Sequence, residues 1–239
     1  MTSFILVHGG MHGGWCWDHV APMLRARNHT VLAPDLPGMG ADTTPLAKVT
    51  LPLTADFIAE LIAAQTEAPI VVGHSLAGLV LSEAAERIPD GIAGLVYVTA
   101  ALLPDGMSFQ DTPGQDAGRS GLVLSEDGVA VSFVPAFAME TFYNTTDLDL
   151  ARSAISRLTP QPVSLIQVPM KLSAERFGRV PRAYIECTED KAFPISVQRQ
   201  MHAMLPCDPV FTLKTDHSPF MSAPEEFAGC LFALAKRFL

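Results

Sequence analysis

Short apolar, largely β-branched runs alternate with longer helical patterns, and this alternation is the feature that most constrains the fold. Most of the runs are nearly continuous in apolar character, which is typical of strands covered on both faces. The sequence therefore predicts an α/β fold, with a mostly parallel central sheet of about six strands flanked by helices. The expected strands are residues 4–7, 30–33, 69–72, 94–98, 182–187 and 209–213. The expected helices are residues 17–27, 54–65 with Thr54 as N-cap, 75–87, 195–205 and 224–238.

The segment from about Pro104 to Gly178 breaks this alternation and contains no strong parallel strand. It begins with a stretch rich in Pro, Gly, Asp and Ser. A turn at residues 126–128 indicates a hairpin, and helical pieces are expected at residues 139–143 and 148–156. We predict one domain, with a core of residues 1–104 and 179–239 and an inserted cap of residues 105–178. The cap should cover the carboxyl ends of the strands, where loops build sites in such folds.

Composition limits the partners. The chain has 239 residues, of which 49% are hydrophobic and 17% charged, so it can bury a substantial core. The net charge of −9 disfavours nucleic acid and anionic membranes as partners. No targeting signal or membrane-spanning stretch is visible, and no pair of the four cysteines has C-x-x-C spacing. We expect a cytoplasmic protein with free thiols, no metal site and no cofactor.

The sequence Val71-Val72-Gly73-His74-Ser75-Leu76-Ala77-Gly78 carries the strongest chemical signal. A strand leads into a small residue, a serine, another small residue and a helix, which is the pattern of a nucleophile elbow. Ala77 stands where glycine is usual, and Gly78 follows it. The alternative interpretation is a serine that caps an ordinary helix. We interpret Ser75 as a catalytic nucleophile.

Two backbone N–H groups are predicted to stabilise an oxyanion. The Leu76 N–H lies at a helix N-terminus, where backbone donors are unpaired and the helix dipole favours negative charge. The second donor should be the Gly10 N–H, in a glycine-rich loop after the first strand. The loop lacks the endings of phosphate-binding motifs, so we discount that alternative.

The general base and its acid partner follow from chain order, which in this type of site runs serine, acid, histidine. His217 lies in a loop just beyond the sixth strand, whereas His202 falls inside an expected helix. Asp190 follows the fifth strand, and we predict that its carboxylate orients His217. The rival carboxylates are Glu189, Asp216 and Asp105.

Several cap residues are candidates for an apolar acyl pocket. They are Phe133, Phe137, Met139, Phe142 and Tyr143, together with Ser218 beside the predicted base. Packing within the cap is an equally good interpretation for each of the cap residues.

Four segments carry a resemblance to a known group. They are residues 4–17 (FILVHGGMHGGWCW), 72–78 (VGHSLAG), 175–194 and 216–224. Together they resemble the plant methylesterase and hydroxynitrile lyase branch of the α/β-hydrolases, with its bacterial esterase relatives. The resemblance implies the α/β-hydrolase fold, a triad of Ser75, Asp190 and His217, and oxyanion donors at Gly10 and Leu76. It also implies a cofactor-free enzyme that is a possible homodimer.

The leading hypothesis is a serine hydrolase that cleaves small apolar carboxylic esters through an acyl-enzyme intermediate. A carbamate, amide or lactone hydrolase would use the same triad. Hydroxynitrile lyases resemble this pattern but carry a threonine at the position of Gly9 and a lysine at the position of Ser218, which disfavours lyase activity. A non-catalytic small-molecule binder on a retained scaffold is the remaining alternative.

Overall fold

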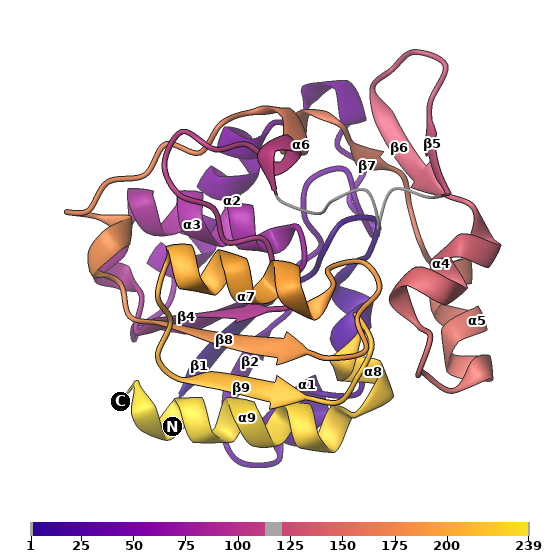
Figure 1. Cartoon of the computed structure of the whole chain (residues 1–239). Coiled ribbons are helices and arrows are strands. Elements are labelled where there is room, and N and C mark those ends of the chain that lie inside the picture. The colour runs from indigo at the N-terminus through magenta and orange to yellow at the C-terminus, as the bar shows by residue number, and fades with distance from the viewer. Residues whose placement is uncertain (1, 113–120, 239) are drawn as a thin grey trace.

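The computed structural model describes residues 2–112 and 121–238. Its central sheet has the strand order β2-β1-β3-β4-β8-β9, and every neighbouring pair is parallel (Figure 1). The strands are β1 (Ser3–Val7), β2 (Thr30–Leu32), β3 (Ile70–His74), β4 (Gly94–Val98), β8 (Arg182–Cys187) and β9 (Val210–Leu213). The predicted α/β architecture is therefore confirmed. Strand β2 pairs with one edge of β1, and β3 pairs with the other edge. The loops after β1 and β3 therefore lead in opposite directions from the carboxyl ends of these strands, which is where such folds bind ligands.

Alternation of side chains along the strands divides the core into two layers. On β1, Ile5 and Val7 face one layer, while Phe4 and Leu6 face the other. On β3, Val71 belongs to the first layer. All these side chains are buried, because helices cover both faces of the sheet.

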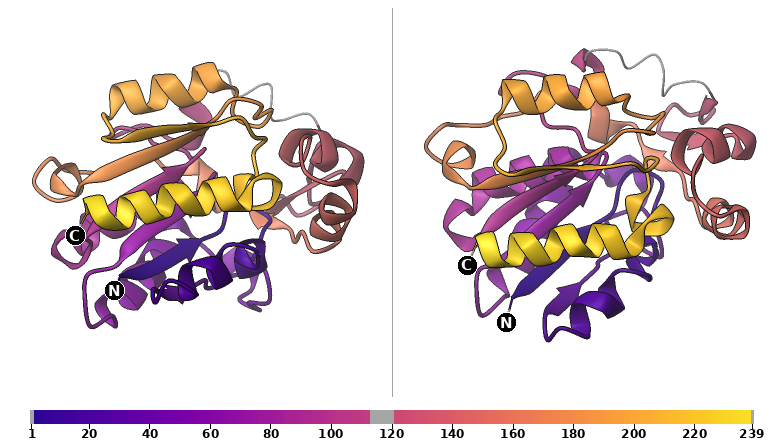
Figure 2. Two further views of the ribbon diagram at one scale, coloured as in Figure 1. Left: turned by 90° about the horizontal axis from the view of Figure 1, so that it is seen from below. Right: turned by 60° about the horizontal axis from the view of Figure 1, so that its bottom comes forward.

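Helices cover both faces of the central sheet (Figures 1 and 2). Helices α2 (Leu51–Ala63), α3 (Ala77–Arg87) and α7 (Ile195–Met204) bury their apolar sides on one face. Helices α1 (Ala21–Arg25) and α9 (Pro224–Arg237) cover the other face, and the short α8 (Pro219–Ser222) leads into α9. Short 3-10 turns occur at Gly14–Trp17, Leu46–Lys48, Pro89–Gly91, Phe109–Asp111 and Phe177–Arg179.

Several helix boundaries differ from the sequence prediction: besides α1 and α2, α3 begins at Ala77 rather than Ser75, and the helix expected at residues 139–143 begins at Pro135. Residues 17–27 do not form one helix: a 3-10 turn ends at Trp17, and α1 begins at Ala21. Pro22 favours a helix start there, because its fixed φ suits the first turn. Helix α2 is capped by Thr50 rather than Thr54, and the Thr50 side chain accepts a hydrogen bond from the Leu53 N–H at 3.3 Å.

In the described residues, the segment expected to form the cap holds a small antiparallel sheet and three helices. The elements are β5 (Leu122–Leu124), β6 (Ala130–Phe133), α4 (Pro135–Phe142), α5 (Leu148–Ser156), β7 (Gln161–Pro162) and α6 (Ser164–Gln167). The small sheet, α4 and α5 lie beyond the carboxyl ends of the central strands, whereas α6 lies beside α2 (Figure 1). The hairpin turn between β5 and β6 lies where it was expected, and α5 matches its predicted range. Residues 113–120 of the predicted cap lie outside the described residues. The division into core and cap stays a prediction.

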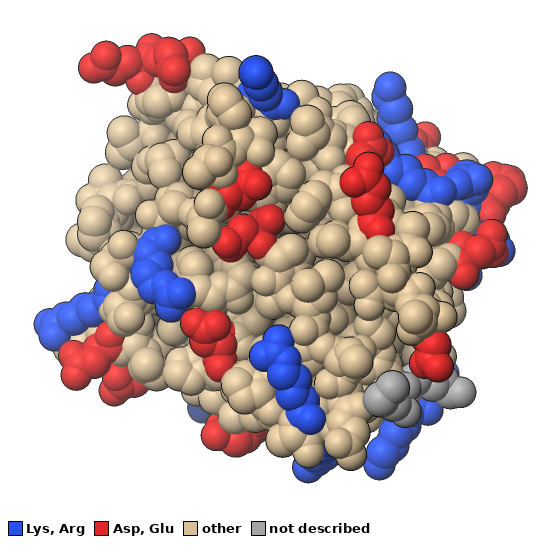
Figure 3. Space-filling model, turned by 180° about the vertical axis from the view of Figure 1, so that it is seen from behind, with Lys and Arg blue, Asp and Glu red and all other residues tan. Residues whose placement is uncertain are grey.

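On the face drawn in Figure 3, basic side chains are interspersed with acidic ones rather than gathered over one element. Exposed ion pairs of the described residues include Arg179 with Asp90 at 2.5 Å and Arg237 with Asp208 at 2.6 Å. None of the helices in the described part of the chain is long and apolar enough to cross a membrane.

Candidate active site

Ser75 occupies a strained turn between β3 and α3. Its φ is 54°, in a region that residues with side chains rarely adopt. The turn is held by the Ser75 N–H, which donates to Val98 O at 3.2 Å, and by the Ser75 carbonyl, which accepts from Ala101 N at 3.0 Å. Such strain persists only where surrounding structure enforces it, and it is common at functional sites.

Two glycines make this turn possible. A Cβ added at Gly73 would lie 2.7 Å from a side-chain carbon of Leu81. A Cβ added at Gly78 would lie 2.0 Å from the Ala101 carbonyl oxygen, a backbone atom that cannot move aside. Ala77, in contrast, is fully buried as the first residue of α3. The strict requirement for glycine after the serine therefore falls on Gly78, which explains why alanine is accepted at position 77.

Ser75, His217 and Asp190 form one chain of hydrogen bonds across three strand-end loops. His217 Nε2 lies 2.9 Å from Ser75 Oγ, and His217 Nδ1 lies 2.7 Å from Asp190 Oδ2. Because a carboxylate only accepts, Nδ1 carries the proton and Nε2 is free to accept the serine proton. The His217 side chain is 1% exposed, so this geometry is shielded from bulk water.

The Asp190 carboxylate is surrounded by donors. Besides His217, it accepts hydrogen bonds from Ala192 N at 2.7 Å, Phe193 N at 2.9 Å, Thr99 Oγ1, and Gln198 Nε2 at 3.5 Å. These donors match an acceptor-only group and fix its orientation.

The rival residues have other partners. Asp216 accepts from Thr145 N at 2.9 Å and Thr146 Oγ1 at 2.8 Å, so it ties the segment after α4 to the histidine loop. Asp105 accepts from Leu172 N at 2.8 Å. His202 contacts Glu186 at 3.2 Å. The structure thus brings Asp190, and not these carboxylates, to the His217 ring.

The Gly10 and Leu76 N–H groups donate to no acceptor within the described residues, and both residues line the same cavity as Ser75.

His8 controls the direction of the Gly10 N–H. Its Nε2 accepts from Leu36 N at 2.9 Å, so its Nδ1 carries the proton and donates to Gly9 O at 2.8 Å. That carbonyl shares a peptide plane with the Gly10 N–H, which is thereby fixed.

His12 braces the next peptide in the same way. Its Nδ1 donates to Gly10 O at 2.8 Å, and its Nε2 accepts from the Tyr143 hydroxyl at 2.7 Å. Burial lowers the pKa of His8 to about 4 and that of His12 to about 3, so both rings are neutral at neutral pH. Burial also raises the pKa of Tyr143 well above its ordinary value, which keeps its hydroxyl a donor.

His74 supports the histidine loop. Its Nε2 donates to the His217 carbonyl at 2.8 Å, while its Nδ1 is buried without a partner among the described residues. Burial, followed by the nearby His217, lowers the pKa of His74 well below its ordinary value. Within residues 2–112 and 121–238, no three His, Cys, Asp or Glu side chains are grouped so that they could hold a metal ion.

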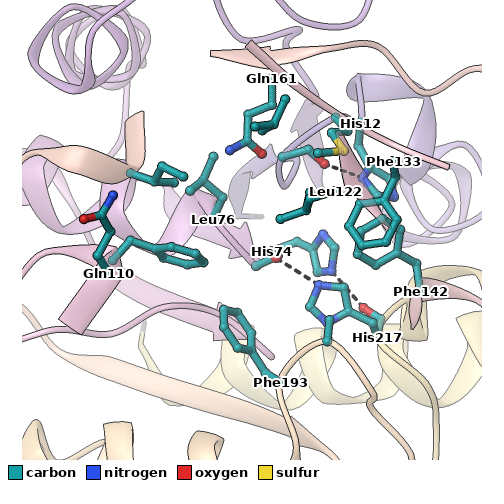
Figure 4. A pocket seen from close by; sticks show the side chains of 17 residues that line it. His12, His74, Leu76, Gln110, Leu122, Phe133, Phe142, Gln161, Phe193 and His217 are labelled. Atoms are coloured by element: carbon teal, nitrogen blue, oxygen red, sulfur yellow. Dashed lines mark hydrogen bonds between the residues drawn. The ribbon is translucent and has the colours of Figure 1, made fainter. Parts of the chain in front are cut away.

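A cavity of about 200 Å³ opens above Ser75, with His217 on one side and Gln161 on the other (Figure 4). This volume lies below the roughly 300–1,000 Å³ of typical ligand pockets, so the cavity suits a small molecule. Most of its wall is apolar. The wall consists of Gly10, Met11, His12, His74, Ser75, Leu76, Phe109, Gln110, Leu122, Val131, Phe133, Phe142, Gln161, Ile166, Ala192, Phe193 and His217.

Only part of the predicted pocket lines this cavity. Phe133 and Phe142 line it, but the structure places the other four predicted residues outside the cavity wall. Phe137 is 43% exposed on the outer side of α4, and Met139 packs against a core layer. Tyr143 is buried behind His12, and Ser218 is fully buried outside the cavity wall. A helix turns its residues in all directions, so neighbours along α4 do not share one cavity.

Sequence reasoning missed several residues of the site. Thr99, Gln198 and Gln161 contact Asp190 or line the cavity from distant segments, and no local motif marks them. His8 and His12 had a detectable signal, since both flank the glycines of the loop after β1.

Comparisons with known proteins agree with this architecture. A model of the Alpha/beta hydrolase family matches residues 4–229. Methylesterase 1 of Arabidopsis thaliana is 31% identical, covering 99% of this chain and 97% of its own. A pyrethroid hydrolase from Sphingobium faniae JZ-2 superimposes with a TM-score of 0.88 and 30% identity, covering 98% of this chain and 97% of that chain. Polyneuridine aldehyde esterase gives a TM-score of 0.87 and 27% identity, with coverage of 98% and 99%.

Proposed function

Because the chain belongs to the alpha/beta hydrolase family, we propose that it is a carboxylesterase-type serine hydrolase that cleaves small, largely apolar esters. One observation carries the proposal: the hydrogen-bonded chain of Ser75, His217 and Asp190 at the floor of an apolar cavity. Methylesterase 1 and polyneuridine aldehyde esterase are named as esterases, which supports an ester over other bonds.

The reaction begins when Ser75 Oγ attacks the ester carbonyl carbon and His217 Nε2 takes its proton. Asp190 stabilises the resulting imidazolium and keeps the ring in place. The N–H groups of Gly10 and Leu76 bind the oxyanion, each contributing about 3 kcal/mol of transition-state stabilisation.

His217 then returns the proton to the leaving alcohol, and an acyl group remains on Ser75. Water, activated by the same imidazole, hydrolyses this acyl-enzyme and regenerates the free serine. No cofactor takes part in any of these steps.

Two positions favour hydrolysis over cyanohydrin cleavage. The lyases that this sequence resembles carry a lysine at the position of Ser218, a residue buried outside the cavity wall. They also carry a threonine at position 9. Here a Cβ on Gly9 would lie 2.7 Å from His74 Nδ1 and 2.9 Å from Ser75 Cβ, so the elbow packs against a glycine.

The experiment measures kcat/KM for p-nitrophenyl butyrate in the wild type and in Ser75→Ala. We expect a loss of at least about 10⁴-fold, since the variant has no nucleophile. Ser153→Ala, on the exposed side of α5, is the matched control and should retain activity. Full activity of Ser75→Ala would overturn the proposal. A parallel panel of carbamates, amides and lactones with matched leaving groups identifies the bond that is cleaved.

A further inference from the structure

Gln161 brings a side-chain amide to the cavity above Ser75. It lies on β7, where its backbone is paired with Val131 of β6, and its side chain points into the cavity (Figure 4). The residue is 7% exposed. A Cβ added at Gly10 would lie 1.7 Å from Gln161 Oε1, so the amide packs directly on the Cα of the glycine that carries the proposed oxyanion donor.

No hydrogen bond joins the Gln161 amide to another described residue. Its polar atoms are not among the buried side-chain atoms that lack a partner, so they reach the surface of the cavity. Most of the cavity wall is apolar. A ligand that fills the cavity therefore displaces water from this amide, and a ligand that offers no hydrogen-bond partner in return binds more weakly.

The position of Gln161 tells which part of an ester it would meet. His217 must protonate the leaving alcohol, so the alcohol part lies on the His217 side of the cavity. Gln161 lies on the opposite side (Figure 4) and against Gly10, whose N–H would hold the carbonyl oxygen. Its amide therefore faces the acyl part, within one or two carbons of the carbonyl.

We propose that Gln161 determines acyl specificity, and that it selects esters with a hydroxyl or carbonyl oxygen on carbon 2 or 3 of the acyl chain. This inference rests on the proposed esterase function and adds a substrate class to it. A terminal amide has both a donor and an acceptor, so it binds either kind of oxygen. The apolar remainder of the wall accepts the alkyl part of the same substrate.

The test compares methyl 3-hydroxybutanoate with methyl 3-methylbutanoate, two esters in which a hydroxyl replaces a methyl group of similar size. The kcat/KM of the hydroxy ester is divided by the kcat/KM of the methyl-branched ester. This ratio is then divided by the corresponding ratio of the hydroxide-catalysed rate constants, which corrects for the intrinsic reactivity of the two esters. For the wild type we expect a corrected ratio of at least about 10, the value of one good hydrogen bond. A corrected ratio of 1 or less would overturn the proposal without any variant.

Variants then locate the effect. Gln161→Met, or Gln161→Leu if the first variant is unstable, should lower the ratio about tenfold. Gln200→Met is the matched control, because Gln200 is exposed on α7 and does not line the cavity. It should leave the ratio within about twofold.

A purely structural role for Gln161 would lower kcat/KM for both esters by the same factor and leave their ratio unchanged, which contradicts the proposal. Failure of the esterase function itself would look different. Neither ester would be hydrolysed, and a fluorophosphonate probe would not label Ser75.

Discussion

At the scale of single residues, the site depends on which nitrogen of His217 carries a proton. The Asp190 carboxylate accepts from Nδ1–H at 2.7 Å, and this leaves Nε2 as the acceptor for Ser75. An amide at position 190 could instead donate to Nδ1 and favour the other tautomer, in which Nε2–H cannot accept the serine proton. The carboxylate thus acts through the tautomer of its neighbour.

Asp190→Asn should therefore lower kcat for p-nitrophenyl butyrate by about 10⁴-fold while the protein remains folded. Steady-state kinetics, with circular dichroism as a check of folding, measure this. Asp105→Asn is the matched control, because Asp105 is exposed and its carboxylate accepts from Leu172 N rather than from His217. Comparable losses in the two variants would contradict the role assigned to Asp190.

At the scale of elements, the turn from β3 into α3 holds both the nucleophile and one oxyanion donor. Helix α3 approaches the loop after β4 so closely that the Cα of Gly78 packs on the Ala101 carbonyl. The backbone of Ala101 also fixes the position of Ser75, since Ala101 N donates to Ser75 O at 3.0 Å. Any side chain at position 78 would push α3, and with it the Leu76 N–H, away from the sheet.

Gly78→Ala should lower the free energy of unfolding by at least about 2 kcal/mol, because the added methyl group meets backbone. Gly229→Ala is the matched comparison on helix α9, where an added Cβ has no neighbour within 4 Å. There alanine should raise the free energy of unfolding by about 1 kcal/mol through helix propensity. Urea unfolding followed by circular dichroism measures both, and equal effects in the two variants would refute the packing argument.

The elements also show what sequence could predict. Patterns that are local along the chain sufficed for the six strands, for the elbow around Ser75 and for the loops that carry Asp190 and His217. Gln161 and Thr99 could not be found in this way, because they reach the site only through pairing of β7 with β6 and of β4 with β8. Boundaries failed where one residue decided them, as Pro22 does for α1 and Thr50 for α2.

At the scale of the whole molecule, buried neutral histidines link stability to pH. Burial lowers the pKa of His8 to about 4 and that of His12 to about 3, whereas an unfolded histidine titrates near 6.5. Below pH 6.5 the unfolded chain therefore binds more protons at these positions than the folded chain. Their contribution to stability is fully present above pH 6.5 and is lost as pH falls toward the folded pKa values.

The free energy of unfolding should accordingly fall between pH 7.5 and pH 4.5, by about 2–3 kcal/mol for each such histidine. Urea unfolding at the two pH values measures this. His12→Gln should shrink the difference by about 2 kcal/mol, and His19→Gln, a change to an exposed side chain, is the control. An unfolding midpoint that stays equal or rises at pH 4.5 would contradict the link.

The central claim is that Ser75 carries the acyl group during turnover, and an acid-quenched reaction tests it most directly. The protein is mixed with p-nitrophenyl butyrate, stopped within a few turnovers, digested and examined by mass spectrometry. The account predicts one butyryl group on the peptide that contains Ser75, and none on that peptide in Ser75→Ala. Hydrolysis that proceeds with no adduct on Ser75, or with the adduct on another residue, would contradict it.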